Sequence, residues 1–213
     1  MFFKIIAIAP PLVFSVMLHE IAHGLAAERF GDPTARRLGR ISLNPLKHID
    51  PVMTVLFPAL LVWAGSPVIF GGAKPVPVNP LYFTNPRRGM AYVALAGPLS
   101  NLVLAALCYF ALNGAVYAEH AFRSPSLLLG LVQVWLTLGL IMNVALAVFN
   151  LLPVPPLDGG RVAVGFLPIR FARSWARLEP FGILIVFGLL YLGVLDKVLD
   201  PALSMLERLP LLH

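Results

Sequence analysis

The sequence predicts an all-α polytopic membrane protein, with four to six transmembrane helices, one re-entrant or broken segment and a short proline-rich extended or β element near its polar site. Two observations support this prediction. The composition is 59% hydrophobic and only 12% charged, whereas a soluble domain has about 25% charged residues. The apolar residues also gather in runs of about 20 residues or more, the length that a helix needs to cross a bilayer. We expect a single domain, residues 1–213.

The same composition excludes several other classes of protein. Disordered chains have low hydrophobicity, and the 17 glycines and 20 prolines follow no short period of the collagen type. The single cysteine, Cys108, excludes an internal disulfide and a thiol pair for metal binding. The net charge of +6 is spread over the loops between apolar runs, whereas nucleic acid requires a clustered basic face. We therefore expect the lipid bilayer as a partner and no nucleic acid.

Four apolar runs are long enough to be transmembrane helices: residues 3–27, 90–117, 127–152 and 181–199. We do not interpret the first run as a cleaved signal peptide, because it contains two histidines and a glutamate, which the apolar core of such a peptide lacks. A fifth run, residues 52–70, is weaker because two prolines and a glycine interrupt it.

The distribution of arginine and lysine predicts the orientation of the chain. The basic residues are concentrated after the first run, before the second and after the third. These stretches lie on one side of the membrane only if residues 52–70 do not fully cross it. Because basic loops face the cytoplasm, we expect a re-entrant or broken segment there. The prediction is a multi-pass protein of the cell membrane, with both chain ends facing away from the cytoplasm.

The first apolar run contains the motif His19-Glu20-Ile21-Ala22-His23. On a helix, two histidines four residues apart point to the same face and can bind one Zn²⁺. Glu20 lies next to the first ligand, so it can reach a metal-bound water without being a ligand itself. Ionisable residues inside a membrane span are costly and indicate a functional site. Catalytic zinc usually has three protein ligands, so one more is required.

Asp158 is the candidate for the third ligand. The prolines that precede it end the third apolar run, and Gly159 and Gly160 permit a tight turn. We therefore expect Asp158 on a rigid, non-helical peptide at the end of the span. His19 lies about 21 Å into a slab of about 30 Å, close to the cytoplasmic face that the third run reaches. The two motifs should meet at similar depth.

These motifs resemble those of the site-2 protease family of intramembrane zinc metalloproteases, peptidase family M50, in its small, compact branch without a PDZ domain. Residues 19–23 resemble the HExxH motif of the family, residues 150–160 its N-x-x-P-x-P-x-L-D-G stretch, and residues 96–101 a further pattern in the intervening span. The loop between the second and third predicted spans is too short for a PDZ module.

The resemblance implies an activity and a role for each residue. His19, His23 and Asp158 would bind one zinc ion, and Glu20 would be the catalytic acid and base. The implied reaction is attack by zinc-bound water on peptide bonds in or beside the transmembrane segments of membrane-protein substrates. An active site facing the cytoplasmic side follows from the predicted orientation.

Several further residues are candidates for substrate binding. The resemblance suggests that Asn150 contacts the substrate backbone, and Pro153 and Pro155 belong to the same stretch. Asn101 either donates to the oxyanion of the reaction or packs between helices. The alternating valines and prolines of residues 69–80 suit an edge strand to which a substrate could add; the alternative is an ordinary proline-rich loop.

Other interpretations of the same residues stay open. His48 and Asp50 either orient a ligand imidazole or form a capped, solvated turn. The chain could instead be a membrane zinc-binding or transport protein that uses the same ligands. Two more alternatives are an inactive module that captures transmembrane helices and a different zinc peptidase with a glutamate as third ligand.

Overall fold

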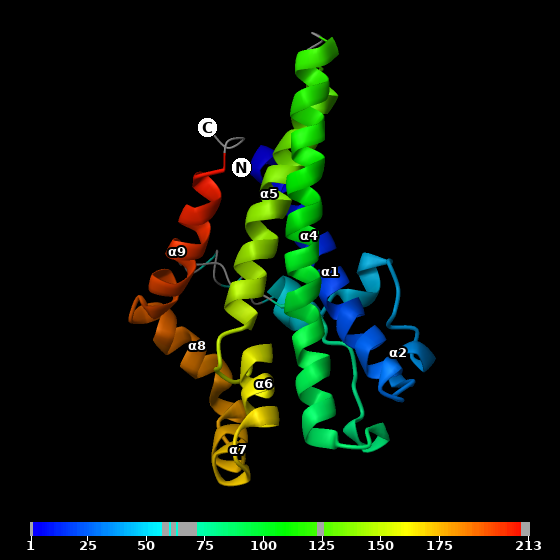
Figure 1. Cartoon of the computed structure of the whole chain (residues 1–213), viewed down its shortest axis with the longest axis vertical. Coiled ribbons are helices and arrows are strands. Elements are labelled where there is room, and N and C mark those ends of the chain that lie inside the picture. Colours follow the sequence, from blue (N-terminus) through cyan, green and yellow to red (C-terminus); the bar gives the residue numbers. More distant parts are fainter. Residues whose placement is uncertain (1, 57–59, 61–62, 64–71, 123–125, 210–213) are drawn as a thin grey trace.

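The computed structural model describes the chain except residues 1, 57–59, 61–62, 64–71, 123–125 and 210–213. The described residues form helices and connecting segments, and none of them forms a β-strand. Three long helices make up the centre: α1 (Phe2–Arg29), α4 (Pro86–Phe122) and α5 (Leu127–Asn150). Each of the three packs against the other two, with α4 longest and most prominent in Figure 1. The all-α polytopic fold is confirmed.

Four stretches of the described chain are long and apolar enough to cross a membrane: Ala7–Arg29, Pro86–Ala121, Leu127–Asn150 and Ile169–Tyr191. The first three correspond to the first three predicted spans. Large apolar side chains on α4 face outwards; Phe110, for example, is 69% exposed. A soluble protein rarely leaves so much apolar surface uncovered, so these faces suit contact with lipid.

The last part of the chain consists of short helices: α6 (Asp158–Phe166), α7 (Ile169–Ala176), η4 (Glu179–Phe181), α8 (Gly182–Tyr191) and α9 (Val194–Glu207). The prediction of one helix over residues 181–199 is therefore wrong. Gly193 interrupts it with a φ of 64°, a left-handed conformation that glycine adopts without steric cost and that a right-handed helix excludes. The stretch that could span the membrane instead ends at Tyr191.

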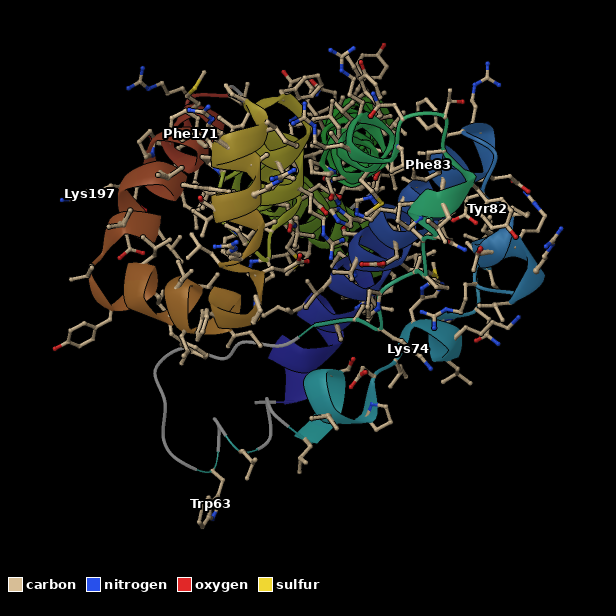
Figure 2. All side chains as sticks on the ribbon, turned by 90° about the horizontal axis from the view of Figure 1, so that it is seen from below. Trp63, Lys74, Tyr82, Phe83, Phe171 and Lys197 are labelled. Atoms are coloured by element: carbon tan, nitrogen blue, oxygen red, sulfur yellow. The ribbon has the colours of Figure 1, made fainter. Side chains whose placement is uncertain are left out.

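Short elements connect α1 to α4: α2 (Thr34–Arg37), η1 (Pro45–His48), η2 (Pro51–Leu56) and η3 (Pro80–Tyr82). The predicted re-entrant segment, residues 52–70, lies largely outside the described residues. We call residues 73–79 the proline strap. The strap is neither helix nor strand. The extended or β element predicted for residues 69–80 is therefore not shown among the described residues, and residues 69–71 lie outside them. Figure 2 shows the chain from Lys74 to Phe83 running beside α1.

The core lies where α1 meets α4 and the chain that follows the strap. Ala27, Phe83 and Val93 form a buried apolar cluster there. Small side chains at a helix contact let two backbones approach closely, and Ala27 and Ala91 are completely buried. This close approach brings α4 to the histidine face of α1.

Candidate metal centre

The two histidines of α1 face α4 and are buried. Their four-residue spacing places them one above the other, with ring centroids 4.6 Å apart. The Nε2 atoms of His19 and His23 lie 3.0 Å from each other. Both rings therefore present the same nitrogen to one point beside the helix.

Asp158 reaches the same point from α6. Its Oδ2 lies 3.1 Å from Nε2 of His19 and 3.3 Å from Nε2 of His23. Among the described residues, these three form the group of metal-ligating type, with ligand atoms all within 4.8 Å of one another. The structure thus brings together the three residues that the sequence nominated, from segments about 140 positions apart in the chain.

The local structure around Asp158 differs from the prediction. Asp158 is the first residue of helix α6 and is not on a non-helical peptide. A Cβ at Gly159 would lie 2.3 Å from the carbonyl oxygens of Leu151 and Leu152. The two glycines therefore do not form a turn; they let the first turn of α6 press against the preceding backbone, which positions the aspartate.

The hydrogen bonds of the two imidazoles determine which nitrogen of each ring carries the hydrogen and which has a lone pair. Nδ1 of His23 donates to the carbonyl oxygen of Val93 over 2.7 Å, because a carbonyl can only accept. Nδ1 of His19 lies 2.5 Å from Oδ1 of Asn101 and donates to it. A neutral imidazole has one N–H, so both Nε2 atoms are acceptors and face each other and a carboxylate.

Three acceptors at this separation repel one another unless a cation lies between them. A proton bridges only two atoms, whereas one metal ion bonds all three. Zn²⁺ with bonds of 2.0–2.1 Å to tetrahedral ligands places those ligands about 3.3 Å apart, close to the observed 3.0–3.3 Å. Oδ2 of Asp158 is buried without a hydrogen-bond partner among the described residues, as a metal ligand would be. The donor set fits zinc.

Glu20 lies at the side of this centre and not within it. Its Oε2 accepts the backbone N–H of Val76 over 2.8 Å, so the proline strap holds the carboxylate. Glu20, Val76 and the three clustered residues line a common cavity of about 200 Å³. The glutamate is thus held beside the centre with access to the same space.

Two charged residues hold the strap in place. Arg40 donates to the carbonyl oxygens of Lys74 and Pro75 over 2.7 and 3.3 Å. Asp32, completely buried, accepts the N–H of Asn79 over 2.6 Å. Sequence analysis did not single out either residue. The Asp-Pro-Thr sequence at 32–34 is a possible signal for Asp32, since an aspartate before a short helix accepts backbone N–H groups.

The pKa of Asp32 is lower than usual. Burial of the carboxyl group raises the pKa, but hydrogen bonds from Thr34 and Asn79 and the nearby charge of Arg37 outweigh burial and lower it. The carboxylate is therefore ionised at neutral pH, which strengthens the hydrogen bonds that it accepts from Thr34 and Asn79.

The candidate substrate residues differ in their access to the cavity. Asn150 lines it, and its Nδ2 donates to the carbonyl of Leu146 over 3.0 Å. Pro155 lines an adjoining cavity of about 420 Å³, which shares Met90 and Arg161 with the first. Pro153 lines neither of these two cavities.

Asn101 does not face the substrate space. Its side chain is 0% exposed, and both ends of its amide bind protein groups, Oδ1 with His19 and Nδ2 with Asn143. Of the two roles that the sequence leaves open for Asn101, these contacts favour packing between helices over contact with substrate or the oxyanion. The α1–α4 contact is too tight at this point, so the amide serves the imidazole instead.

His48 and Asp50 also have other roles than orienting a ligand imidazole. Nε2 of His48 donates to the carbonyl of Ser42 over 2.8 Å, and its own carbonyl accepts the N–H of Lys74. Oδ1 of Asp50 accepts the N–H of Val52 at the start of η2. The alternative interpretation, a capped turn, describes Asp50, while buried His48 supports the strap.

Comparison with known proteins finds a peptidase family and relatives that are named as zinc metalloproteases. The family described as Peptidase family M50 matches residues 113–192, a stretch that includes Asp158. "Putative zinc metalloprotease YwhC" of Bacillus subtilis is 38% identical over 199 residues, which cover 91% of this chain and 84% of that protein. No solved structure gives a significant match.

Two further relatives carry the same kind of name. "Putative zinc metalloprotease Rip2" of Mycolicibacterium smegmatis is 35% identical over 87% of this chain and 66% of its own length. "Putative zinc metalloprotease MJ0611" of Methanocaldococcus jannaschii is 28% identical over 75% of this chain and 68% of its own length. The chain thus spans about two thirds of the length of these two proteins.

Proposed function

The chain belongs to peptidase family M50, the site-2 protease family, and on that premise we propose that it is an intramembrane zinc metalloprotease. Its substrates are membrane proteins whose peptide bonds it hydrolyses in or beside their transmembrane segments. The observation that supports this proposal is the convergence of three buried acceptors, from His19, His23 and Asp158, beside a glutamate in a shared cavity. The relatives named above are described as zinc metalloproteases.

His19, His23 and Asp158 would hold the metal. When bound there, zinc supplies a Lewis acid that polarises the scissile carbonyl and increases the acidity of water. The protein contributes the shape and orientation of the site. The two imidazoles are fixed by their Nδ1–H bonds, and α6 is fixed by the close contact at Gly159.

Glu20 is the general base and acid of the proposed reaction. Its carboxylate takes a proton from the attacking water, whose oxygen forms the new bond to the scissile carbonyl carbon. The carboxyl group then gives that proton to the leaving amine when the C–N bond breaks. The hydrogen bond from Val76 to Oε2 limits rotation of the carboxylate, so that the base is oriented before substrate arrives.

The substrate must unwind, because the amides of a helix are hydrogen-bonded to each other and shielded. Unwound amides need new partners in a site of low polarity, where an unpaired group costs several kcal/mol. Asn150 and two valines of the strap, Val76 and Val78, line the cavity. We propose that the side chain of Asn150 and the backbone of the strap are the new hydrogen-bond partners of the unwound substrate. Pro155 lines the adjoining cavity and would contact a neighbouring part of the same peptide.

The protein would be a multi-pass component of the cell membrane. Four apolar stretches are long enough to cross, and the basic residues that follow the first and the third stretch favour a cytoplasmic position for these two connections. His19 lies past the middle of α1, on the side of Arg29. The active site therefore faces the cytoplasmic side in this proposal.

The test uses purified full-length protein with model transmembrane peptides, with and without a metal chelator. We expect cleavage within or beside the apolar stretch, lost on chelation and restored by zinc. Glu20→Gln should abolish cleavage while retaining zinc, since Glu20 is not a ligand. Glu207→Gln, at an exposed position in α9, is the matched control and should cleave normally.

The same variant separates the alternative, a membrane zinc-binding or transport protein. Such a protein needs the three ligands but no proton shuttle, so Glu20→Gln would retain its activity. Unchanged cleavage by Glu20→Gln would contradict the proposed role of the glutamate.

A further inference from the structure

We infer that Asn101 and Asn143 are positioning residues that fix the single hydrogen of His19 on Nδ1 and thereby keep its Nε2 open for a metal ion. The inference rests on the proposed metal centre. Asn143 lies on α5, away from the cavity, and contacts no ligand atom. Its effect would pass through Asn101.

The network begins at backbone carbonyls, which can only accept hydrogen bonds. Nδ2 of Asn143 donates to the carbonyl of Gly139 over 2.8 Å and to Oγ of Ser15 over 2.8 Å. The hydroxyl of Ser15 has its own hydrogen directed to the carbonyl of Pro11 over 2.7 Å, so Oγ receives the amide. Asn143 is therefore oriented in one way, with its Oδ1 directed toward α4.

That orientation determines the orientation of the next amide. Nδ2 of Asn101 donates to Oδ1 of Asn143 over 2.7 Å, and the other end of the amide, Oδ1, faces Nδ1 of His19 over 2.5 Å. Rotating the Asn101 amide by half a turn would set two acceptors against each other at Asn143. The imidazole then has one permitted arrangement, with hydrogen on Nδ1 and a lone pair on Nε2.

Burial of these side chains leaves each amide with one favourable orientation. Ser15, Asn101 and Asn143 are all less than 3% exposed, so no solvent can satisfy a misplaced donor or acceptor. A buried polar group without a partner is unfavourable, because it has lost its hydrogen bonds to water and gained none in exchange. Each amide therefore adopts the orientation in which every contact pairs a donor with an acceptor.

The two histidines reach the same state by different routes. The Nδ1–H of His23 binds a backbone carbonyl directly, at Val93. His19 reaches the carbonyl of Gly139 through two asparagines, so that α1, α4 and α5 all contribute. In both cases a group that cannot donate determines the position of the hydrogen.

Removing the acceptor of Asn143 should therefore affect zinc binding at a distance. In Asn143→Leu, Nδ2 of Asn101 loses its acceptor at 2.7 Å and keeps only the longer contact of 3.4 Å with the carbonyl oxygen of Ser15, so that it can turn toward His19. The imidazole would then place its hydrogen on Nε2, where it opposes metal binding. We expect zinc affinity to fall about 10–100-fold, the usual effect of losing a group that orients a ligand.

A double-mutant cycle tests the inference because Asn101→Asp has two oxygens and no wrong orientation. Either oxygen of the aspartate accepts the Nδ1–H of His19, so Asn143 becomes dispensable. We expect Asn143→Leu to weaken zinc binding in the wild-type background. In the Asn101→Asp background it should not weaken binding, because there it removes an acceptor, Oδ1 of Asn143, that would face the second carboxylate oxygen. A role in helix packing alone would lower stability in both backgrounds and would give no such rescue.

The measurements are zinc affinity of the purified full-length protein by chelator competition, and the absorption spectrum of the cobalt-substituted protein. Thermal unfolding of the metal-free variants reports packing separately. Asn113→Leu is the matched control, because the Asn113 amide donates to the carbonyl of Tyr109 on α4 away from the centre. It should keep the affinity and the cobalt spectrum of the wild type.

Two results would overturn the inference. One is wild-type zinc affinity in Asn143→Leu; the other is equal loss of affinity on both backgrounds. If Asn143→Leu alone does not fold, comparing Asn101→Asp with the Asn101→Asp/Asn143→Leu variant still decides, since the double variant must bind zinc at least as tightly as Asn101→Asp. Failure of the proposed function is distinct, because the wild-type protein would then bind no zinc or cleave no peptide.

Discussion

A single methyl group at Gly97 should destroy the metal centre. Gly97 lies where α4 crosses the histidine face of α1. A Cβ built there would stand 2.5 Å from both Nε2 and Cε1 of His23 and 2.6 Å from Cε1 of His19. Ordinary contacts of a Cβ begin at about 3.4 Å, so the methyl group would overlap both rings by about 0.8–0.9 Å.

Neither ring can retreat without breaking a hydrogen bond. Nδ1 of His23 is tied to Val93 and Nδ1 of His19 to Asn101, both on α4 itself. The strain must therefore move α4 or displace the ligand nitrogens. Overpacking of this kind costs about 1–3 kcal/mol, and metal ligands tolerate errors of about 0.2 Å. We expect Gly97→Ala to lower zinc affinity at least about 100-fold and to abolish cleavage.

Gly114→Ala on the same helix is the control. A Cβ at Gly114 meets nothing within 4 Å, and alanine favours a helix over glycine by about 1 kcal/mol. Gly114→Ala should bind zinc and cleave normally and should unfold at the same or a higher temperature. Chelator competition measures the affinity, and the peptide assay measures cleavage. Wild-type zinc affinity in Gly97→Ala would refute the geometry of the centre.

Two further variants test other parts of the site. Asp158→Asn should lose most zinc binding, whereas Gln in place of any one glutamate should retain it; retention by Asp158→Asn would favour a glutamate as third ligand. Asp32→Asn should weaken the hold on the strap by about 1–3 kcal/mol and reduce cleavage more than zinc affinity. Because the pKa of Asp32 is lowered in the folded protein, its stabilising contribution is complete above the unfolded pKa of about 3.9. That contribution is lost as pH falls through the lower folded value, so the wild type and Asp32→Asn should converge in unfolding temperature at acid pH. A difference that does not shrink would contradict the ionised state of Asp32.

Three residues of the site could be predicted because they are ionisable and lie within an otherwise apolar run. Ionisable side chains are costly inside an apolar run, so His19, Glu20 and His23 stand out without any structure. Their spacing fixes a common face on a helix. Asp158 follows a proline-rich end of another apolar run, where a charged group is less unusual, and it needed the family resemblance as support.

The features that sequence analysis missed depend on contacts between distant segments. The orientation of Asn101 is determined by α5, and the function of Asp32 depends on the strap that passes over it. Gly159 suggested a turn, but its lack of a side chain is required by the backbone of Leu151 and Leu152. Gly193 lies inside the predicted span 181–199 and was not singled out as its end, because glycine also occurs within membrane-spanning helices.

The arrangement also links metal binding to the packing of the helices. Two of the proposed ligands belong to α1 and one to α6, and both helices pack against α4. A bound ion would neutralise three acceptors that otherwise repel each other, so it should join α1 to α6 across the cavity. Ligands that bind only the folded state stabilise it in proportion to their affinity. The centre is therefore both the chemical site of the proposed protease and a stabilising bond between two parts of the fold that are far apart in the chain.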